Sequence, residues 1–208
     1  IRIAGIGSWP LFDYSHQFNS QGKRLVLYVG RFGRYKGLDH LLRAMSLMED
    51  QYQLVLVGDG PEKNSLSSLI SELNLNNRVA ILPHVEYSKL PEIYRSADVF
   101  VLPSTDRGEA FGLVALEAMA CGVPVITTQL GTGTTFHNQH GITGYHVPPR
   151  DEKALAIAII QCVRENLKEK NSRLIRQRAE EFSIDKFRNS WEELILSLGQ
   201  SGRRSESS

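Results

Sequence analysis

Two glutamates, Glu109 and Glu117, stand eight positions apart in the sequence, with the pair Phe111-Gly112 between them. That pair follows an apolar run at 99–102 and a loop, and it begins a segment with the pattern of a helix. The first N–H groups of a helix lack internal partners and carry the positive end of its dipole, so they bind anions. Eight residues at the helical rise of ~1.5 Å span roughly 12 Å. This arrangement suits a ligand with phosphates in the middle and hydroxyls at both ends, such as a sugar nucleotide.

Each of the two acids also has a simpler interpretation. Glu109 could merely complement the helix dipole, and Glu117 could be a buried acid paired with some other side chain. Glu117 is flanked by Leu116 and Ala118 in a strongly apolar helix. A charge in such surroundings is costly unless it is paired, which favours a functional role.

A second candidate site is the glycine-rich loop 30–37, which follows an apolar run and precedes a helical pattern. Its glycines let the backbone approach a ligand closely. Arg31 offers a planar bidentate donor and Lys36 a compact positive charge, and both suit phosphate. The alternative is a solvated basic loop. The loop contains neither G-x-G-x-x-G nor G-x-x-x-x-G-K-[ST], which disfavours a dinucleotide site and a P-loop.

Strand and helix patterns alternate along the chain, and this predicts the elements that must position both loops. Apolar runs predict six strands, at 24–29, 53–57, 79–82, 98–102, 123–127 and 145–147. Helical spacing predicts helices at 38–48, 61–73, 88–96 (capped by Ser88), 111–120 (ended by Gly122), 152–168, 171–180 and 184–198. The alternation predicts a doubly wound α/β fold, a parallel six-stranded sheet of the Rossmann-like type with helices on both faces. Ligands of such folds bind at the carboxyl ends of the strands, where both candidate loops lie.

Composition sets limits on the class of protein. The chain has 208 residues, of which 41% are apolar and 23% charged, with a net charge of +1. These values are typical of one globular domain, and no global field recruits nucleic acid or an anionic membrane. The two cysteines, Cys121 and Cys162, do not suggest a disulfide framework, which favours a reducing compartment. The chain begins without a Met, so we expect a piece of a longer protein.

Five collinear motifs resemble the retaining glycosyltransferases of the GT-B fold, and most closely the large family four. The resemblance covers about residues 24–198, in order and at the usual spacing. The motifs are Gly30-Arg31 with Lys36-Gly37, the VGDGP stretch at 57–61, Glu109-x7-Glu117 followed by CGVPV at 121–125, GITG at 141–144 with VPP at 147–149, and Phe182-Ser183 before the closing helix.

The resemblance implies roles that agree with the chemistry of the residues. Arg31 and Lys36 would hold the donor diphosphate and stabilise the leaving group, Glu117 would hold the ribose, and Glu109 would contact the transferred sugar beside the reacting carbon. The implied catalytic residues are therefore Glu109, Arg31 and Lys36. The implied donor-binding residues are these three with His84 and Val85, which would frame the base, and Ala110, Phe111, Gly112, Leu113 and Glu117.

The resemblance also implies the setting of the reaction. The donor would be a nucleotide diphosphate sugar, linked to UDP or GDP, with no cofactor or metal required. Residues 1–22 would be an interdomain crossover, 23–198 the nucleotide-sugar-binding domain and 199–208 a disordered tail. The enzyme would be a retaining hexosyltransferase, inactive as this domain alone. Its partners would be an N-terminal acceptor-binding domain and a glycan or glycolipid acceptor, and not nucleic acid. The expected location is the cytoplasm, with the inner face of the cell membrane as an alternative.

One stretch departs from the family pattern. Many relatives carry a Gly-Gly loop and then a Pro-Glu pair after the fifth strand, whereas residues 130–136 here are LGTGTTF, without an acid. Relatives from bacterial surface-polysaccharide pathways are similar at this point, which implies a role in bacterial polysaccharide or lipopolysaccharide biosynthesis. The loop should border the donor sugar, so its sequence leaves the identity of that sugar open.

Other interpretations have weaker support. A non-catalytic nucleotide-sugar-binding module on the same fold is the main alternative to an enzyme. A flavodoxin-like signalling domain would carry an acidic cluster at the strand ends, whereas here basic residues and glutamates are spread over several loops. His137 and His140 have the H-x-x-H spacing of metal ligands, but they lie on a Gly-rich loop with no third ligand in view.

Overall fold

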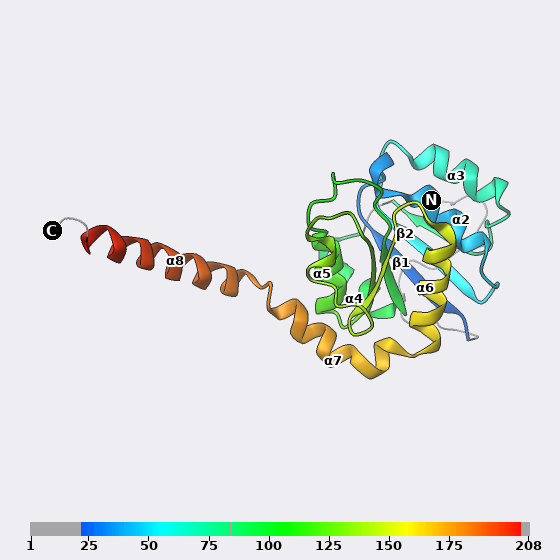
Figure 1. The fold of residues 1–208 in the computed structure, drawn as a ribbon. Coiled ribbons are helices and arrows are strands. Elements are labelled where there is room, and N and C mark those ends of the chain that lie inside the picture. Colours follow the sequence, from blue (N-terminus) through cyan, green and yellow to red (C-terminus); the bar gives the residue numbers. More distant parts are fainter. Residues whose placement is uncertain (1–21, 84, 205–208) are drawn as a thin grey trace.

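The fold is built on a six-stranded parallel sheet with the order β3-β2-β1-β4-β5-β6 (Figure 1). The computed structural model describes residues 22–83 and 85–204, with the backbone alone for 197–204. The order reverses between β1 and β4, which makes the carboxyl ends of these two strands the topological switch point. The strands are β1 (Arg24–Val29), β2 (Tyr52–Val57), β3 (Val79–Leu82), β4 (Val99–Leu102), β5 (Val125–Thr128) and β6 (Gly144–Val147).

Helices cover both faces of the sheet. In Figure 1, α2, α3 and α6 lie on one side and α4 and α5 on the other, and α7 packs against α5. The helices are α2 (Leu38–Ser46), α3 (Lys63–Glu72), α4 (Leu90–Ser96), α5 (Leu113–Ala120), α6 (Glu152–Arg164), α7 (Leu167–Glu180) and α8 (Ile184–Arg204), with short 3-10 turns η1 (Arg34–Lys36), η2 (Tyr87–Lys89) and η3 (Gly133–Thr135). The predicted fold class is therefore confirmed.

The sequence pattern of the central strands explains why they lie in the middle of the sheet. Residues 25–29 of β1 and all of β4 are buried. A parallel strand covered by helices on both faces has no solvent side, so its sequence is continuously apolar. The predicted bounds of β1 and β3 agree with the structure. Those of β2, β4 and β6 differ by one residue at one end, and those of β5 by two residues at its start and one at its end.

Several predicted helix ends were wrong. Helix α5 begins at Leu113 rather than at Phe111, because Gly112 has a φ of +78°, which no helical residue adopts. Helix α3 begins at Lys63, so the chain at 61–62 is a turn that precedes it. Ser88 lies in η2 and does not cap α4, and its hydroxyl lies 3.5 Å from the Glu86 carboxylate.

The C-terminal elements also differ from their predicted bounds. Helix α6 ends at Arg164 and α7 begins at Leu167, so the end of the first helix and the start of the second both come earlier in the chain than predicted. The break lies at Asn166, which has a left-handed φ of +51°. Helix α8 continues to Arg204, so 199–204 are helical rather than the disordered tail that we expected. The predicted crossover at 1–22 lies outside the described residues except for Gly22, as do residues 205–208 of the tail.

Helix α8 projects away from the sheet and its layers (Figure 1). Apolar side chains recur on it at helical spacing and are exposed, among them Phe187, Trp191 and Ile195. None of the helices in the described part of the chain is long and apolar enough to cross a membrane.

The loops after β1 and β2 pack so closely that a glycine is required between them. At Gly58, φ is +137°, and a Cβ there would lie 2.0 Å from the carbonyl oxygen of Gly30. The amide of Gly30 donates to the Val57 carbonyl at 2.9 Å, and that of Phe32 to the Asp59 carbonyl at 2.9 Å. The VGDGP motif therefore fixes the course of the loop that carries Arg31 and Lys36.

We expect Gly58→Ala to lower the free energy of unfolding by roughly 2–4 kcal/mol, because it adds both backbone strain and a clash. Gly141→Ala is the matched control. Its φ is +77° but no atom lies within 4 Å of the added Cβ, so only the conformational cost of about 1 kcal/mol applies. Denaturant unfolding of both variants measures the difference, and equal losses would contradict the close packing of the two loops.

Candidate functional site

Lys36 and Glu109 form an ion pair where the loops after β1 and β4 meet. The Nζ of Lys36 lies 2.6 Å from Oε2 of Glu109, and the two side chains are only 12% and 10% exposed. The hydroxyl of Ser104 donates to the same oxygen at 3.0 Å, and Thr128 on β5 donates to the Ser104 carbonyl. Two predicted catalytic residues, 73 positions apart, are thus brought together. Glu109 does more than complement the helix dipole.

The second carboxylate oxygen of Glu109 remains available. Its Oε1 accepts no hydrogen bond from the described residues, since both bonds to this side chain end on Oε2. A carboxylate can accept several hydrogen bonds. Glu109 can therefore hold Lys36 and still accept a hydrogen bond from a ligand hydroxyl.

Three consecutive amides lie on the chain between Glu109 and Glu117 without hydrogen-bond acceptors. Within the described residues, the N–H groups of Phe111, Gly112 and Leu113 donate to no backbone or side-chain oxygen. The carbonyls on the same segment are occupied, because Ala110 accepts from the Gly133 amide at 2.8 Å and Phe111 contacts the His137 ring at 2.8 Å. These free donors are the amides for which the sequence predicted an anion.

Glu117 lies in the second turn of α5 and is held from behind by Tyr94. The hydroxyl of Tyr94 on α4 donates to Oε2 of Glu117 at 2.8 Å. Tyr94 is 2% exposed, and burial together with the charge of Glu117 raises the pKa of its hydroxyl, so it remains a donor. The sequence left open that Glu117 is paired with another side chain, and Tyr94 is such a partner. Only Oε2 is engaged, because Oε1 has no hydrogen bond within the described residues. Because 109–112 are not helical, the helical estimate of the distance between the two acids does not apply.

The side chain of Arg31 makes no contact with the Lys36–Glu109 ion pair among the interactions of the described residues. Its side chain is exposed and makes no hydrogen bond or ion pair with the described residues. Its carbonyl accepts from the buried Tyr28 hydroxyl at 3.0 Å, and burial raises the pKa of that hydroxyl. The backbone of Arg31 is thus fixed while its guanidinium faces solvent. Its predicted phosphate contact stays a prediction.

The predicted base-binding residues are less well defined. His84 lies outside the described residues. Val85 is partly buried and packs against the core. Ala110 is exposed at the start of the amide segment, and its carbonyl is taken by Gly133.

The two histidines of the H-x-x-H pattern have different partners. His137 is fully buried and its Nε2 contacts the Phe111 carbonyl, whereas His140 Nδ1 accepts from the His146 amide at 3.1 Å. No group of three His, Cys, Asp or Glu side chains in the described part of the chain could hold a metal ion. The sequence did not predict the contacts of Tyr94 and His137 with the site, because only folding of the chain brings these residues near it.

Two hollows flank these residues. One of about 690 Å³ lies beside η1 and is lined by Tyr35, Thr105 and Arg150, among others. The other, of about 820 Å³, lies between the start of α5 and α8 and is mostly apolar. Neither is lined by Lys36, Glu109 or Glu117, so these two hollows lie beside the three side chains rather than around them.

Comparison with known proteins identifies the family to which the chain belongs. Residues 13–181 match the family model of the glycosyl transferases group 1. The chain belongs to this family. Among curated relatives, a D-rhamnosyltransferase (WbpZ) of Pseudomonas aeruginosa is 38% identical over 69% of the chain, and the N-acetyl-alpha-D-glucosaminyl L-malate synthase of Bacillus anthracis is 33% identical over 82%.

Solved structures of glycosyltransferases have the same fold. Sucrose-phosphate synthase from Thermosynechococcus elongatus is 36% identical, with a TM-score of 0.73 over 94% of the chain. Anabaena HepE in complex with UDP is 26% identical, with a TM-score of 0.79 over 92%. The resemblance to GT-B glycosyltransferases is thus confirmed. The chain spans 37% and 43% of the two curated relatives and about half of the two solved chains.

Removal of the Tyr94 hydroxyl tests how Glu117 is held in this member of the glycosyl transferases group 1 family. Tyr94→Phe keeps the ring, whose centroid lies 5.8 Å from that of Phe100, and loses the bond to Glu117. Hydrogen bonds to charged groups are worth about 1.5–3 kcal/mol. Because Glu117 is only half-buried, we expect a loss of about 1–2 kcal/mol in the free energy of unfolding.

Tyr145→Phe is the matched control, because the Tyr145 hydroxyl donates to the exposed Glu165 at 2.5 Å. Water replaces such a bond easily, so the loss should be under about 1 kcal/mol. Denaturant titrations of both variants give the comparison. A Tyr94→Phe variant as stable as the wild type would show that Tyr94 does not hold Glu117.

Proposed function

We propose that this chain binds a nucleotide diphosphate sugar at the carboxyl ends of β1 and β4 and forms the donor-binding part of a retaining hexosyltransferase. The observation that carries the proposal is the Lys36–Glu109 pair beside the free amides of Phe111 to Leu113. A cation and a row of N–H donors suit a diphosphate, and the adjacent carboxylate suits a sugar hydroxyl.

The chemistry of transfer explains why these groups are needed. The bond between the anomeric carbon and a diphosphate oxygen breaks, and its electron pair stays on the diphosphate. The acceptor hydroxyl forms the new bond and releases its proton. Lys36 and the amides of the α5 N-terminus, with Arg31 approaching from solvent, would stabilise the charge that develops on the leaving group. These donors supply the positive charge without a metal ion, so the proposal includes no cofactor.

The remaining site residues would fix the two ends of the donor. Glu117 would accept hydrogen bonds from the ribose hydroxyls with Oε1, while Tyr94 holds Oε2. Glu109 would contact the transferred sugar with its free oxygen. Main-chain groups near His84 and Val85 would frame the base. Retention of the anomeric configuration is proposed from the family resemblance, and Glu109 need not be a nucleophile for it.

The relatives suggest in which kind of pathway the protein acts, although their names specify different substrates. One is named as a D-rhamnosyltransferase and another as an N-acetyl-alpha-D-glucosaminyl L-malate synthase, and a structural neighbour was solved with UDP. We infer a UDP- or GDP-linked donor and a glycan or glycolipid acceptor in bacterial polysaccharide or lipopolysaccharide biosynthesis, in the cytoplasm or at the inner face of the membrane. An N-terminal acceptor-binding domain would complete the enzyme.

Titration of UDP, GDP and dTDP sugars against the full-length protein by calorimetry tests the proposed donor site. We expect one of them to bind, and we expect Lys36→Ala to lower kcat/KM for transfer on the order of 100-fold, because it removes charge stabilisation from the transition state. Arg34→Ala is the control, since Arg34 is an exposed cation of the same turn. It should change kcat/KM by less than about threefold.

Two outcomes would contradict the proposal in different ways. Near-wild-type turnover by Lys36→Ala would remove Lys36 from the leaving-group site. Failure of the folded protein to bind any of the three donors would overturn the donor-binding function. Donor binding without any sugar transfer would favour the non-catalytic module instead.

Glu117→Gln tests the ribose contact. The variant keeps an acceptor for Tyr94 and loses the charge, so UDP and GDP should bind about tenfold more weakly, in line with ~1.4 kcal/mol of lost binding energy. Glu165→Gln is the control, because this exposed acid also accepts from a tyrosine hydroxyl but caps the C-terminal end of α6. Calorimetric Kd values provide the measurement. Equal Kd values for the two variants would place Glu117 outside the binding site.

A further inference from the structure

His137 is buried behind the amide segment of the proposed donor site. It is 0% exposed, and its ring packs edge-on against Phe111 and Phe182, with centroids 5.3 and 6.3 Å away. Its Nε2 lies 2.8 Å from the carbonyl oxygen of Phe111. It follows η3 and lies directly after the stretch 130–136 that departs from the family pattern, so its contact with Phe111 ties the end of that stretch to the start of α5.

The contact determines which ring nitrogen of His137 donates. A carbonyl oxygen only accepts, so Nε2 must carry a hydrogen and donate it. Nδ1 is buried without a hydrogen-bond partner within the described residues, and in the neutral ring it carries a lone pair. Burial lowers the pKa of His137, and the charges of Arg178 and His146 act in the same direction, against the Phe111 bond and Glu109. His137 is therefore a neutral donor at neutral pH.

Holding a carbonyl also orients the amide on the same peptide unit. The described chain has no cis peptide bond, and in a trans peptide the C=O and the N–H point in opposite directions. The His137 bond turns the Phe111 carbonyl inward, so the Gly112 N–H points away from His137. In the same way the Gly133 amide holds the Ala110 carbonyl at 2.8 Å, so the Phe111 N–H points away from Gly133.

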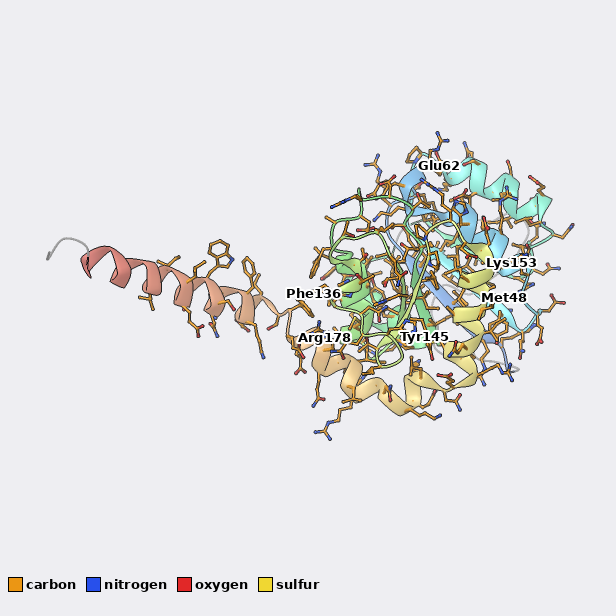
Figure 2. All side chains as sticks on the ribbon, in the orientation of Figure 1. Met48, Glu62, Phe136, Tyr145, Lys153 and Arg178 are labelled. Atoms are coloured by element: carbon orange, nitrogen blue, oxygen red, sulfur yellow. The ribbon has the colours of Figure 1, made fainter. Side chains whose placement is uncertain are left out.

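Arg178 on α7 fixes the position of His137 in turn. Its guanidinium donates to the carbonyls of Phe136 and His137, the latter at 3.1 Å, and lies 4.7 Å from the centroid of the Phe182 ring. Figure 2 shows Phe136 and Arg178 near each other where α7 packs on the rest of the domain. The guanidinium carbon of Arg178 lies 5.6 Å from the centroid of the Phe136 ring. A chain of contacts thus runs from α7 through His137 to the amides.

We propose that His137 is a positioning residue that aims the Phe111–Gly112 amide segment at the donor diphosphate, an inference that rests on the proposed function. The imidazole contacts no donor atom in this arrangement. It acts through the carbonyl of Phe111, and its neutrality leaves the positive charge of the site on Lys36 and Arg31.

Two substitutions in the full-length protein separate positioning from packing. His137→Phe keeps a ring in the aromatic cluster and removes the donor, whereas His137→Gln keeps an N–H donor. We expect His137→Phe to weaken the binding of UDP and GDP about tenfold and His137→Gln to restore it to within about threefold of the wild type. If His137→Phe does not fold, His137→Leu, with a smaller side chain, takes its place. Calorimetry gives Kd, and circular dichroism checks folding.

His146→Leu is the matched control. The Nε2 of His146 also contacts a backbone carbonyl, that of Asn138, at 2.8 Å, and His146 makes no hydrogen bond to α5 or to the amide segment within the described residues. The control should therefore leave nucleotide affinity unchanged. A folded His137→Phe variant with wild-type Kd would overturn the positioning role while leaving the donor site intact. If the wild type itself bound neither UDP nor GDP, the proposed function would fail and the positioning role with it.

The pH dependence of stability provides a readout of the neutral donor. Because the pKa of His137 is depressed below its ordinary value of 6.5 in the folded state, its contribution to stability is present above pH 6.5 and is lost as pH falls below it. His137→Gln should flatten this loss between pH 6.5 and 5 relative to the wild type. An unchanged pH profile in His137→Gln would show that His137 is not held neutral by its surroundings, and would count against the proposal.

Discussion

The Lys36–Glu109 ion pair is the contact on which the candidate site depends. It connects the loop after β1 with the loop after β4, and these strands are neighbours at the point where the strand order reverses. Connections leave β1 and β4 toward opposite faces of the sheet, so their loops part there and leave a gap at the carboxyl edge. Only because the sheet order places β4 beside β1 can residues 73 positions apart meet at this gap. The pair then fixes the distance between the two loops.

The burial of this pair explains how it could serve a charged donor. A lone ammonium or carboxylate at this depth would be costly, and each of the two residues removes that cost for the other. Ser104 adds a neutral donor to the same carboxylate oxygen, with its own position set by Thr128. Under the proposed function, the diphosphate offers Lys36 further negative oxygens, while Glu109 keeps its place through Ser104. Low exposure strengthens each of these interactions relative to water.

Much of this architecture followed from the sequence, for identifiable reasons. Continuous apolar runs predicted the buried strands, and the strand ends predicted which loops carry Lys36 and Glu109, because parallel topology brings those ends to one edge. The start of α5 was misplaced because the left-handed φ of Gly112 has no signature in the apolar spacing. Tyr94 and His137 could not be predicted as site residues. Each reaches its partner across a tertiary contact. Tyr94 lies in no motif, and the H-x-x-H pattern of His137 points to a metal ion rather than to the Phe111 carbonyl.

The groups behind the site share one property, which gives the charged residues their effect. Tyr94 and His137 are buried, and burial moves the pKa of each in the direction that keeps it neutral. Neutral donors can hold the Glu117 carboxylate and the Phe111 carbonyl without attracting the ligand themselves. A buried cation in either position would compete with Lys36 and Arg31 for the diphosphate. Under the proposed function, neutral groups behind and charged groups at the edge would direct the field of the site toward the side from which a donor would approach.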